Sequence, residues 1–144
     1  MNIEEKCELA CNKNTSSEIL DKLSYDKDED IRSFVACNKN TSKETLKRLS
    51  NDENVSVRYE VAKNENTTTE TLDKLANDEY FYVRRVVAYN ENTSPEILKR
   101  LANDKNYSVR LAVASNKNTP IETLKRIAND KNYIIIIPAL CQLD

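Results

Sequence analysis

Cysteine is the residue of this chain with the widest range of chemistry, because a thiolate can bind zinc, ligate an iron–sulfur cluster or attack an electrophile. The chain has four cysteines, Cys7, Cys11, Cys37 and Cys141. The first two are spaced i, i+4, which places both on one face of a helix. Cys141 lies near the opposite end of the chain, so at most three thiolates can meet near the N-terminus.

Three thiolates fall short of the four ligands that zinc and cluster sites usually have, and the chain contains no histidine to complete a set. We therefore expect no cofactor, and reduced thiols at small, partly buried positions. A metal or iron–sulfur site at Cys7, Cys11 and Cys37 is the alternative.

Groups that catalyse reactions are scarce. With no histidine and no glycine, the chain has neither the commonest general base nor a glycine-rich phosphate loop. No serine or cysteine lies beside a recognisable base. We therefore interpret the chain as non-enzymatic.

Arginine and aspartate each recur at a fixed interval of 26 residues. The members of this ladder are Arg32, Arg58, Arg84, Arg110, Asp26, Asp52, Asp78, Asp104 and Asp130. A guanidinium and a carboxylate that recur at one register suit a charge-assisted hydrogen bond within or between repeats. We interpret the ladder as structural; the alternative is a row of arginines that binds the phosphate or carboxylate groups of a ligand.

A second set of side chains varies between repeats. Tyr82, Arg85 and Tyr89 are spaced i, i+3, i+7 and therefore lie on one side of a helix. Tyr59 and Leu111 occupy the position of Arg85 in the neighbouring repeats. Tyrosine and arginine are enriched at the hot spots of interfaces. We predict that these five residues bind a protein or peptide partner.

The elements that must position these side chains form an internal repeat. Each copy begins with asparagine in the pattern N-x-N-T and ends with V/I-R-x-x-V-A, although the last copy departs from this ending. The copies span residues 12–37, 38–63, 64–89, 90–115 and 116–141 without insertions, after a leading half-repeat at 1–11. A fixed period of this length predicts a solenoid in which each unit buries its apolar face against its neighbours. We expect residues 1–144 to form a single repeat domain.

Each repeat contains the signals of two short helices. Thr41 and Glu44 have the spacing of a capping box, so we expect a first helix over about residues 41–51. A second helix follows the acidic turn, and we expect Phe81 to pack in the seam between helices. Since glycine is absent, we expect asparagine to adopt the left-handed conformation where helices end.

The unit N-x-N-T-x-x-E-x-L-x-x-L-x-x-D…V-R-x-x-V-A resembles the leucine-rich repeat variant family, and its second half is similar to the second helix of HEAT repeats. The resemblance implies an all-α, right-handed superhelical solenoid of about five two-helix repeats without a β-sheet. In the family's first described member one helix per repeat is 3₁₀, and N-terminal cysteines ligate an iron–sulfur cluster; the resemblance leaves open whether the repeats of this chain contain a 3₁₀ helix. Here the cysteines depart from the family's pattern, because Cys141 lies five repeats from Cys11.

The net charge and the hydropathy of the chain limit which partners and which cellular location are expected. Lys plus Arg number 22 and Asp plus Glu number 24, for a net charge of −2, which favours a protein partner over nucleic acid. The N-terminal residues are too charged for a signal peptide, and no apolar run reaches the roughly 18 residues of a membrane span. We therefore expect a cytoplasmic protein without membrane contact.

Two alternatives concern the C-terminal half. It is mildly basic, so a nucleic-acid-binding, HEAT-like solenoid is the alternative function. The basic residues are Lys99, Arg100, Lys105, Arg110, Lys117, Lys125, Arg126 and Lys131. Within the run Ile134–Ile137, Ile134 replaces a usually polar residue and Ile136 replaces the ladder arginine, so this run is more apolar than its counterparts. It either folds back as a cap before Pro138, or contacts a second copy in a homodimer, or is covered by a partner.

Overall fold

The computed structural model describes residues 1–129, and within that range it contains α-helices and turns but no β-strand. Nine-residue helices recur every 26 residues: α1 (Ile3–Cys11), α3 (Glu29–Cys37), α5 (Val55–Lys63), α7 (Phe81–Tyr89) and α9 (Tyr107–Ser115). Shorter helices lie between them: α2 (Ser17–Leu23), α4 (Lys43–Leu49), α6 (Thr69–Leu75), α8 (Pro95–Leu101) and α10 (Ile121–Ala128). All ten described helices are α-helices, so within residues 1–129 neither helix of a repeat is 3₁₀.

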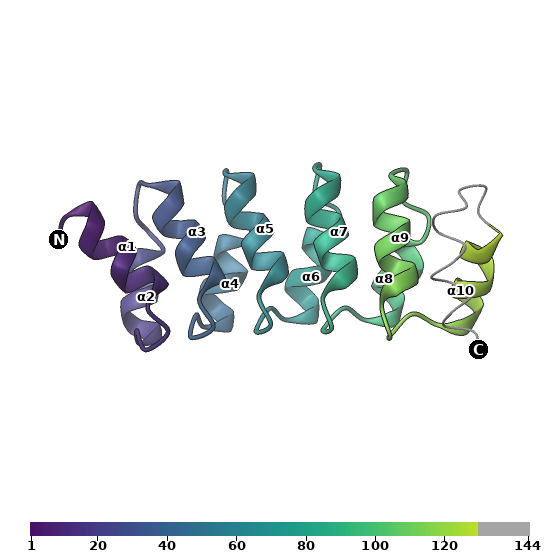
Figure 1. Ribbon diagram of the computed structural model, residues 1–144, viewed down its shortest axis with the longest axis horizontal. Helices are drawn as coiled ribbons and strands as arrows, with labels where there is room; N and C mark the ends of the chain where they lie inside the picture. The colour runs from purple at the N-terminus through teal and green to yellow at the C-terminus, as the bar shows by residue number, and fades with distance from the viewer. Residues whose placement is uncertain (130–144) are drawn as a thin grey trace. The chain divides into compact units, whose positions relative to one another are not determined.

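The chain divides into two compact units, Met1–Thr71 and Leu72–Asp144. In the first unit α3 packs against both α1 and α5, while α2 and α4 pack behind these long helices. In the second unit α7 packs against α9, and α8 contacts both. Each unit is therefore a stack of helix pairs in two layers, as Figure 1 shows. No helix between residues 1 and 129 combines the length and the apolar composition of a membrane span.

Leucine and valine from the two helix layers form the core. Leu46 and Leu49 of α4 and Val57 and Val61 of α5 are buried, as the apolar spacing predicts. Helices of seven to nine residues are marginal in isolation because nucleation is costly. Burial between the layers, and not local propensity, therefore stabilises each helix pair.

The helix starts differ from the predicted capping box. The N-cap of α4 is Ser42, whose hydroxyl accepts a hydrogen bond from the Thr45 amide at 3.1 Å. Thr41 lies one residue earlier, and its hydroxyl donates to the Val35 carbonyl of α3 at 2.5 Å. The prediction that Thr41 forms a capping box with Glu44 is wrong. The Thr41 hydroxyl donates to a carbonyl of the preceding helix, and Ser42 caps the following helix instead.

The asparagines that end the long helices also differ from expectation. No residue between 1 and 129 has a positive φ, so the predicted left-handed asparagine is wrong. Asn38 is extended, with φ −72° and ψ 131°. Its Nδ2 donates to the carbonyl of Ala10 in the leading half-repeat at 2.8 Å and to that of Asn12 in the preceding repeat at 3.0 Å. Its Oδ1 accepts from the Asn40 amide at 2.9 Å. The turn is therefore closed by the side chain, and no residue needs a left-handed backbone.

The second asparagine of the N-x-N pattern extends this network. Asn40 Nδ2 donates to the carbonyls of Lys13 at 2.7 Å and Thr15 at 3.0 Å, both in the preceding repeat. In the second unit, Asn118 donates in the same way to Glu91 at 2.8 Å. Side-chain amides thus join consecutive repeats within each unit and hold the long helices at a set spacing.

Candidate functional site

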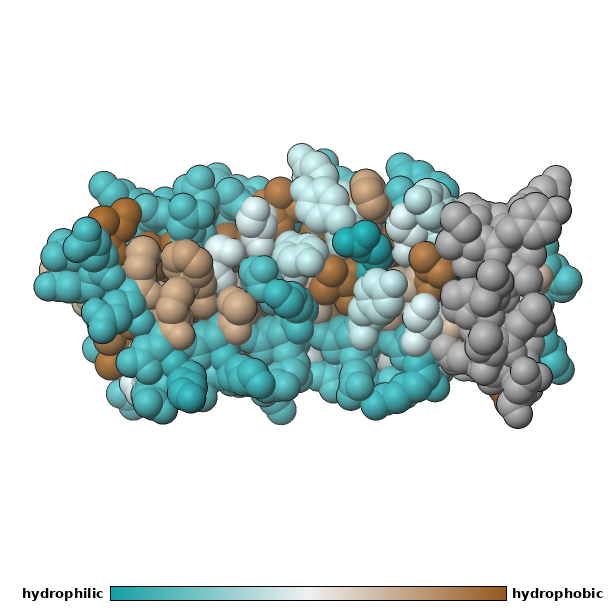
Figure 2. Space-filling view, viewed as in Figure 1, coloured by the Kyte–Doolittle hydropathy of each residue, from teal (hydrophilic) through white to brown (hydrophobic). Residues whose placement is uncertain are grey.

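The outward side of α7 and α9 carries four of the five residues predicted to bind a partner. Val83, Val87 and Ala88 of α7 are fully buried, which leaves the predicted residues on the opposite side of the helix. Tyr89 is 50% exposed, and the other three are half-buried. We name this surface the α7–α9 face and define it by Tyr82, Arg85, Tyr89 and Leu111. In Figure 2, pale and brown areas over α7 and α9 interrupt the hydrophilic surface.

Tyr59, the fifth predicted residue, lies in the other unit. Tyr59 is half-buried on α5 and belongs to the first unit, whereas α7 and α9 belong to the second. The predicted set is therefore divided between the two units, and only its second-unit members define the α7–α9 face.

Helix α7 begins unlike its counterparts. The N-caps of α3, α5 and α9 are Asp28, Asn54 and Asn106, and each side chain accepts a backbone amide of its helix. The equivalent residue of α7 is Tyr80, which makes no side-chain cap hydrogen bond. Loss of a cap costs roughly 1 kcal/mol. In the third repeat an aromatic residue, Tyr80, therefore stands at the N-cap, and α7 lacks the stabilisation that a capping side chain provides.

Three consecutive aromatic residues form a cluster at this helix start. The rings of Tyr80 and Tyr82 lie 5.5 Å apart between centroids, and those of Phe81 and Tyr82 lie 5.7 Å apart in an edge-to-face arrangement. Phe81 is 40% exposed, so the prediction that it packs in the seam between helices is wrong. Its ring packs on Tyr82 and leaves much of its apolar surface exposed.

The ladder residues lie between repeats. Arg84 donates through Nε and Nη2 to both carboxylate oxygens of Asp104 in the next repeat, at 2.6 and 2.9 Å. Its Nη1 donates to the carbonyls of Asp78 and Glu79 in its own repeat. In the first unit Arg32 binds Asp52 in the same way at 2.7 and 3.0 Å. These arginines have their donors occupied by the protein itself.

The remaining ladder positions show parts of this arrangement. Arg58 donates to the carbonyl of Asp52 at 2.8 Å, and Arg110 donates to that of Asp104 at 2.8 Å. Lys6 takes the arginine position of the leading half-repeat and pairs with Asp26 at 2.6 Å. Asp130 lies outside the described residues.

The ladder shifts the pKa values of its carboxylates. Burial alone would raise the pKa of Asp104, but hydrogen bonds from Arg84 and the Asn106 amide outweigh it and lower the pKa. A hydrogen bond from Lys6 lowers the pKa of Asp26. A carboxylate with a lowered pKa stabilises the fold above its unfolded-state pKa of about 4, and that contribution is lost as pH falls through the folded-state pKa.

We expect stability of the wild-type chain to fall as pH drops from about 5 to about 2, and to fall less in an Asp104→Asn variant. The variant is less stable at neutral pH because it lacks the charge-assisted bond to Arg84. Urea unfolding followed by circular dichroism at several pH values measures both slopes. Equal slopes for the two proteins would contradict a lowered pKa at Asp104.

The cysteines near the N-terminus are free thiols. Cys7 is half-buried, and Cys11 and Cys37 are exposed. Burial, followed by the neighbouring Cys7, raises the pKa of Cys11. Burial, followed by the charge of Glu60, raises the pKa of Cys37. A raised pKa keeps a thiol protonated at neutral pH and lowers its reactivity towards metals and electrophiles.

No three of the His, Cys, Asp and Glu side chains in residues 1–129 are arranged to hold a metal ion. The metal or cluster alternative at Cys7, Cys11 and Cys37 therefore gains no geometric support from the described part of the chain. Cys141 lies outside it.

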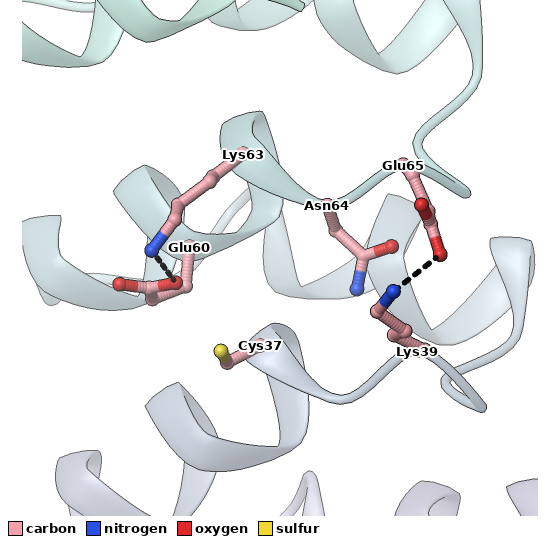
Figure 3. Close-up of a pocket in the computed structure, with 6 residues that line it drawn as sticks. All are labelled: Cys37, Lys39, Glu60, Lys63, Asn64 and Glu65. Atoms are coloured by element: carbon pink, nitrogen blue, oxygen red, sulfur yellow. Dashed lines mark ion pairs between the residues drawn. The ribbon is translucent and has the colours of Figure 1, made fainter. Parts of the chain in front are cut away.

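A pocket of about 220 Å³ lies between α3 and α5 (Figure 3). Its lining residues are Cys37, Lys39, Glu60, Lys63, Asn64 and Glu65. Two ion pairs join four of them, Lys63 with Glu60 at 3.6 Å and Lys39 with Glu65 at 3.4 Å. The charges balance, and the one thiol has a raised pKa. The pocket therefore lacks an activated nucleophile.

Several basic residues behind the nucleic-acid alternative have acidic partners. Arg100 pairs with Asp73 of the preceding repeat at 2.6 Å, and Lys117 pairs with Glu91 at 3.0 Å. Lys125 pairs with Glu122 at 3.1 Å. These pairs reduce the positive charge available to a phosphate backbone.

The fold defines the class: the chain is an all-α repeat solenoid. A solved structure described as "a leucine-rich repeat variant with a novel repetitive protein structural motif" is similar over 99% of this chain, with 25% identity and a TM-score of 0.77. This similarity confirms the resemblance found in the sequence. The chain spans 56% of that protein's length.

A designed armadillo repeat protein also matches, at 15% identity and a TM-score of 0.54 over 96% of this chain and 89% of its own. At that identity the match shows the fold alone. No family model and no curated protein matches the chain.

Proposed function

We propose that the protein is a non-enzymatic scaffold that binds a protein or peptide through the α7–α9 face. One observation carries the proposal: α7 replaces a helix cap with exposed aromatic residues. A sequence that breaks a local rule without structural gain is typical of a functional site. Tyrosine and arginine on a rigid helix supply large contact areas at low entropic cost.

The hydrogen bonds that recur between repeats support the same proposal. Asparagine amides and the Arg84–Asp104 pair recur from repeat to repeat and bind the protein's own backbone and side chains. The residues of the α7–α9 face change at every repeat. Solenoid proteins bind partners on such variable surfaces, which a constant scaffold holds in place.

We expect affinity capture from cells of the source organism to recover a partner with the wild-type chain and to recover at least about tenfold less with Tyr82→Ala/Tyr89→Ala. Tyr25→Ala is the matched control, because Tyr25 is 67% exposed and lies in the first unit. Circular dichroism confirms that each variant is folded, and quantitative mass spectrometry compares the recovered proteins.

Full retention of the partner by the double variant would refute the α7–α9 face as the binding site. Recovery of nucleic acid alone, lost steeply as salt rises, would instead favour the nucleic-acid alternative.

A further inference from the structure

We infer that the segment bound at the α7–α9 face is an acidic peptide, with one of its carboxylates hydrogen-bonded to the Arg85 guanidinium. This inference rests on the function proposed above and names the chemistry of the partner. It is carried by the hydrogen-bonding state of Arg85 and by the charges around it.

Arg85 differs from every other arginine of the chain. The chain has eight arginines, all within the described residues. Seven of them contact an aspartate or a backbone carbonyl. These seven are Arg32, Arg48, Arg58, Arg84, Arg100, Arg110 and Arg126. Arg85 makes no hydrogen bond and no ion pair in the part of the chain that the structure describes.

The burial of Arg85 makes its lack of a partner informative. The side chain is half-buried on α7 between two tyrosines of the same helix side, Tyr82 three residues before it and Tyr89 four residues after it. A partly desolvated guanidinium loses hydration without gaining a protein acceptor. An incoming carboxylate restores those hydrogen bonds and accepts two of them in parallel.

The helices of the face carry no acidic residue that competes for this role. Neither Phe81–Tyr89 nor Tyr107–Ser115 contains aspartate or glutamate, whereas α3 and α5 of the first unit carry Glu29, Asp30 and Glu60. The acidic residues nearest in the chain are engaged elsewhere. Asp104 binds Arg84, and Glu91 pairs with Lys117. The carboxylate of Asp78 accepts a hydrogen bond from the Tyr80 amide, and the backbone carbonyls of Asp78 and Glu79 accept hydrogen bonds from Arg84.

The same charges favour a peptide over a nucleic acid. Arg84 is buried against Asp104, and Arg110 donates to backbone carbonyls, so Arg85 is the only arginine of the two described helices without a protein acceptor. One cation among tyrosines suits one or two carboxylates beside apolar side chains. A phosphate backbone requires several cations in a row.

Selection from a library of short random peptides displayed on phage tests the inference with the whole chain as bait. We expect the recovered peptides to be enriched in aspartate and glutamate next to apolar residues, and the acidic enrichment to be lost when Arg85→Gln is the bait. Lys99→Gln is the control for net charge, because it removes one exposed cation from α8 in the same unit.

A recovered peptide is then measured by fluorescence anisotropy beside a copy in which each carboxylate is replaced by its amide. We expect the amide copy to bind the wild-type chain at least about tenfold more weakly, and both peptides to bind Arg85→Gln equally, because a charge-assisted pair is lost in each case. Lys99→Gln should bind both peptides as the wild-type chain does. Arg85→Lys should restore only part of the difference, since lysine lacks the planar fork.

Three results would overturn the inference, and they separate it from the proposed function. Enrichment of peptides without acidic residues would refute the acidic partner and leave peptide binding intact. Equal binding of the acidic peptide and its amide copy to the wild-type chain would do the same. No enrichment over an uncoated surface would refute the inference together with peptide binding at this face.

Discussion

Replacing Arg84 with alanine lowers the free energy of unfolding by about 3 kcal/mol, because it leaves the buried carboxylate of Asp104 without its main partner. The two side chains are 8% and 7% exposed, so water cannot take the place of the guanidinium. This loss of stability is at the lower end of what breaking a buried ion pair costs, because Asp104 keeps the hydrogen bond from the Asn106 amide. The carbonyls of Asp78 and Glu79 lose a donor as well.

Equilibrium unfolding in urea measures this loss, and a double-mutant cycle separates its parts. Arg84→Ala combined with Asp104→Ala should be less destabilised than the sum of the two single variants, because the double variant retains no unpaired buried charge. Arg85→Ala is the neighbouring control. It removes an arginine without a protein partner and should change stability by less than about 0.5 kcal/mol. Additive effects of the two ladder substitutions would contradict the pairing.

Replacing Asn64 with aspartate should destabilise the first unit by about 3 kcal/mol at neutral pH. Asn64 is 6% exposed, and its Nδ2 donates to the carbonyls of Ala36 at 2.7 Å and Asn38 at 3.0 Å. Aspartate has the same shape but only accepts hydrogen bonds, so the substitution turns two attractive contacts with carbonyl oxygens into repulsive ones.

Alanine at the same position should cost about 2 kcal/mol, because it removes the donors without adding a charge. Asn51→Ala is the control in the same unit. Asn51 is exposed in the turn after α4, its side-chain amide donates to the Lys47 carbonyl of that helix at 3.3 Å, and its loss should be nearly neutral. Thermal and urea unfolding measure all three variants.

The pH dependence distinguishes the two Asn64 variants. Facing two carbonyls, the introduced aspartate has a raised pKa in the folded state, so the aspartate variant recovers relative to the alanine variant as pH falls through that pKa. A constant difference between the two variants from neutral to acidic pH would contradict the placement of the Asn64 amide.

The helices could be predicted from the 26-residue period because each apolar position has one environment in every repeat. The polar contacts that cap the helices and close the turns could not be predicted in the same way. Thr41 and Ser42 are adjacent hydroxyls, and either could cap the following helix; only the position of the preceding carbonyl assigns them. Asparagine in place of glycine suggested a left-handed turn, whereas it closes the turn with its side chain.

The candidate site also has features that the sequence predicts and features that it does not. Arg84 recurs at the ladder period and Arg85 does not, so the sequence alone distinguished a repeated arginine from a variable one. Among the described residues, Arg85 has no hydrogen-bond acceptor because no carboxylate or carbonyl lies within reach. Those distances cannot be derived from the 26-residue period. The exposure of Phe81 depends likewise on how the ring of Tyr82 turns.

Within residues 1–129, the hydrogen bonds that asparagine side chains donate between repeats run in one direction, from a later repeat to carbonyls earlier in the chain. Asn38, Asn64 and Asn116 each donate to the carbonyl of the asparagine that begins the preceding repeat, and to the carbonyl two residues before that asparagine. A copied repeat inserted in register therefore finds acceptors ready in its predecessor and offers the same acceptors to its successor. An ancestral gene could lengthen or shorten this array by whole tandem duplications or deletions without any compensating mutation, while a face such as that of α7 evolves on a single copy.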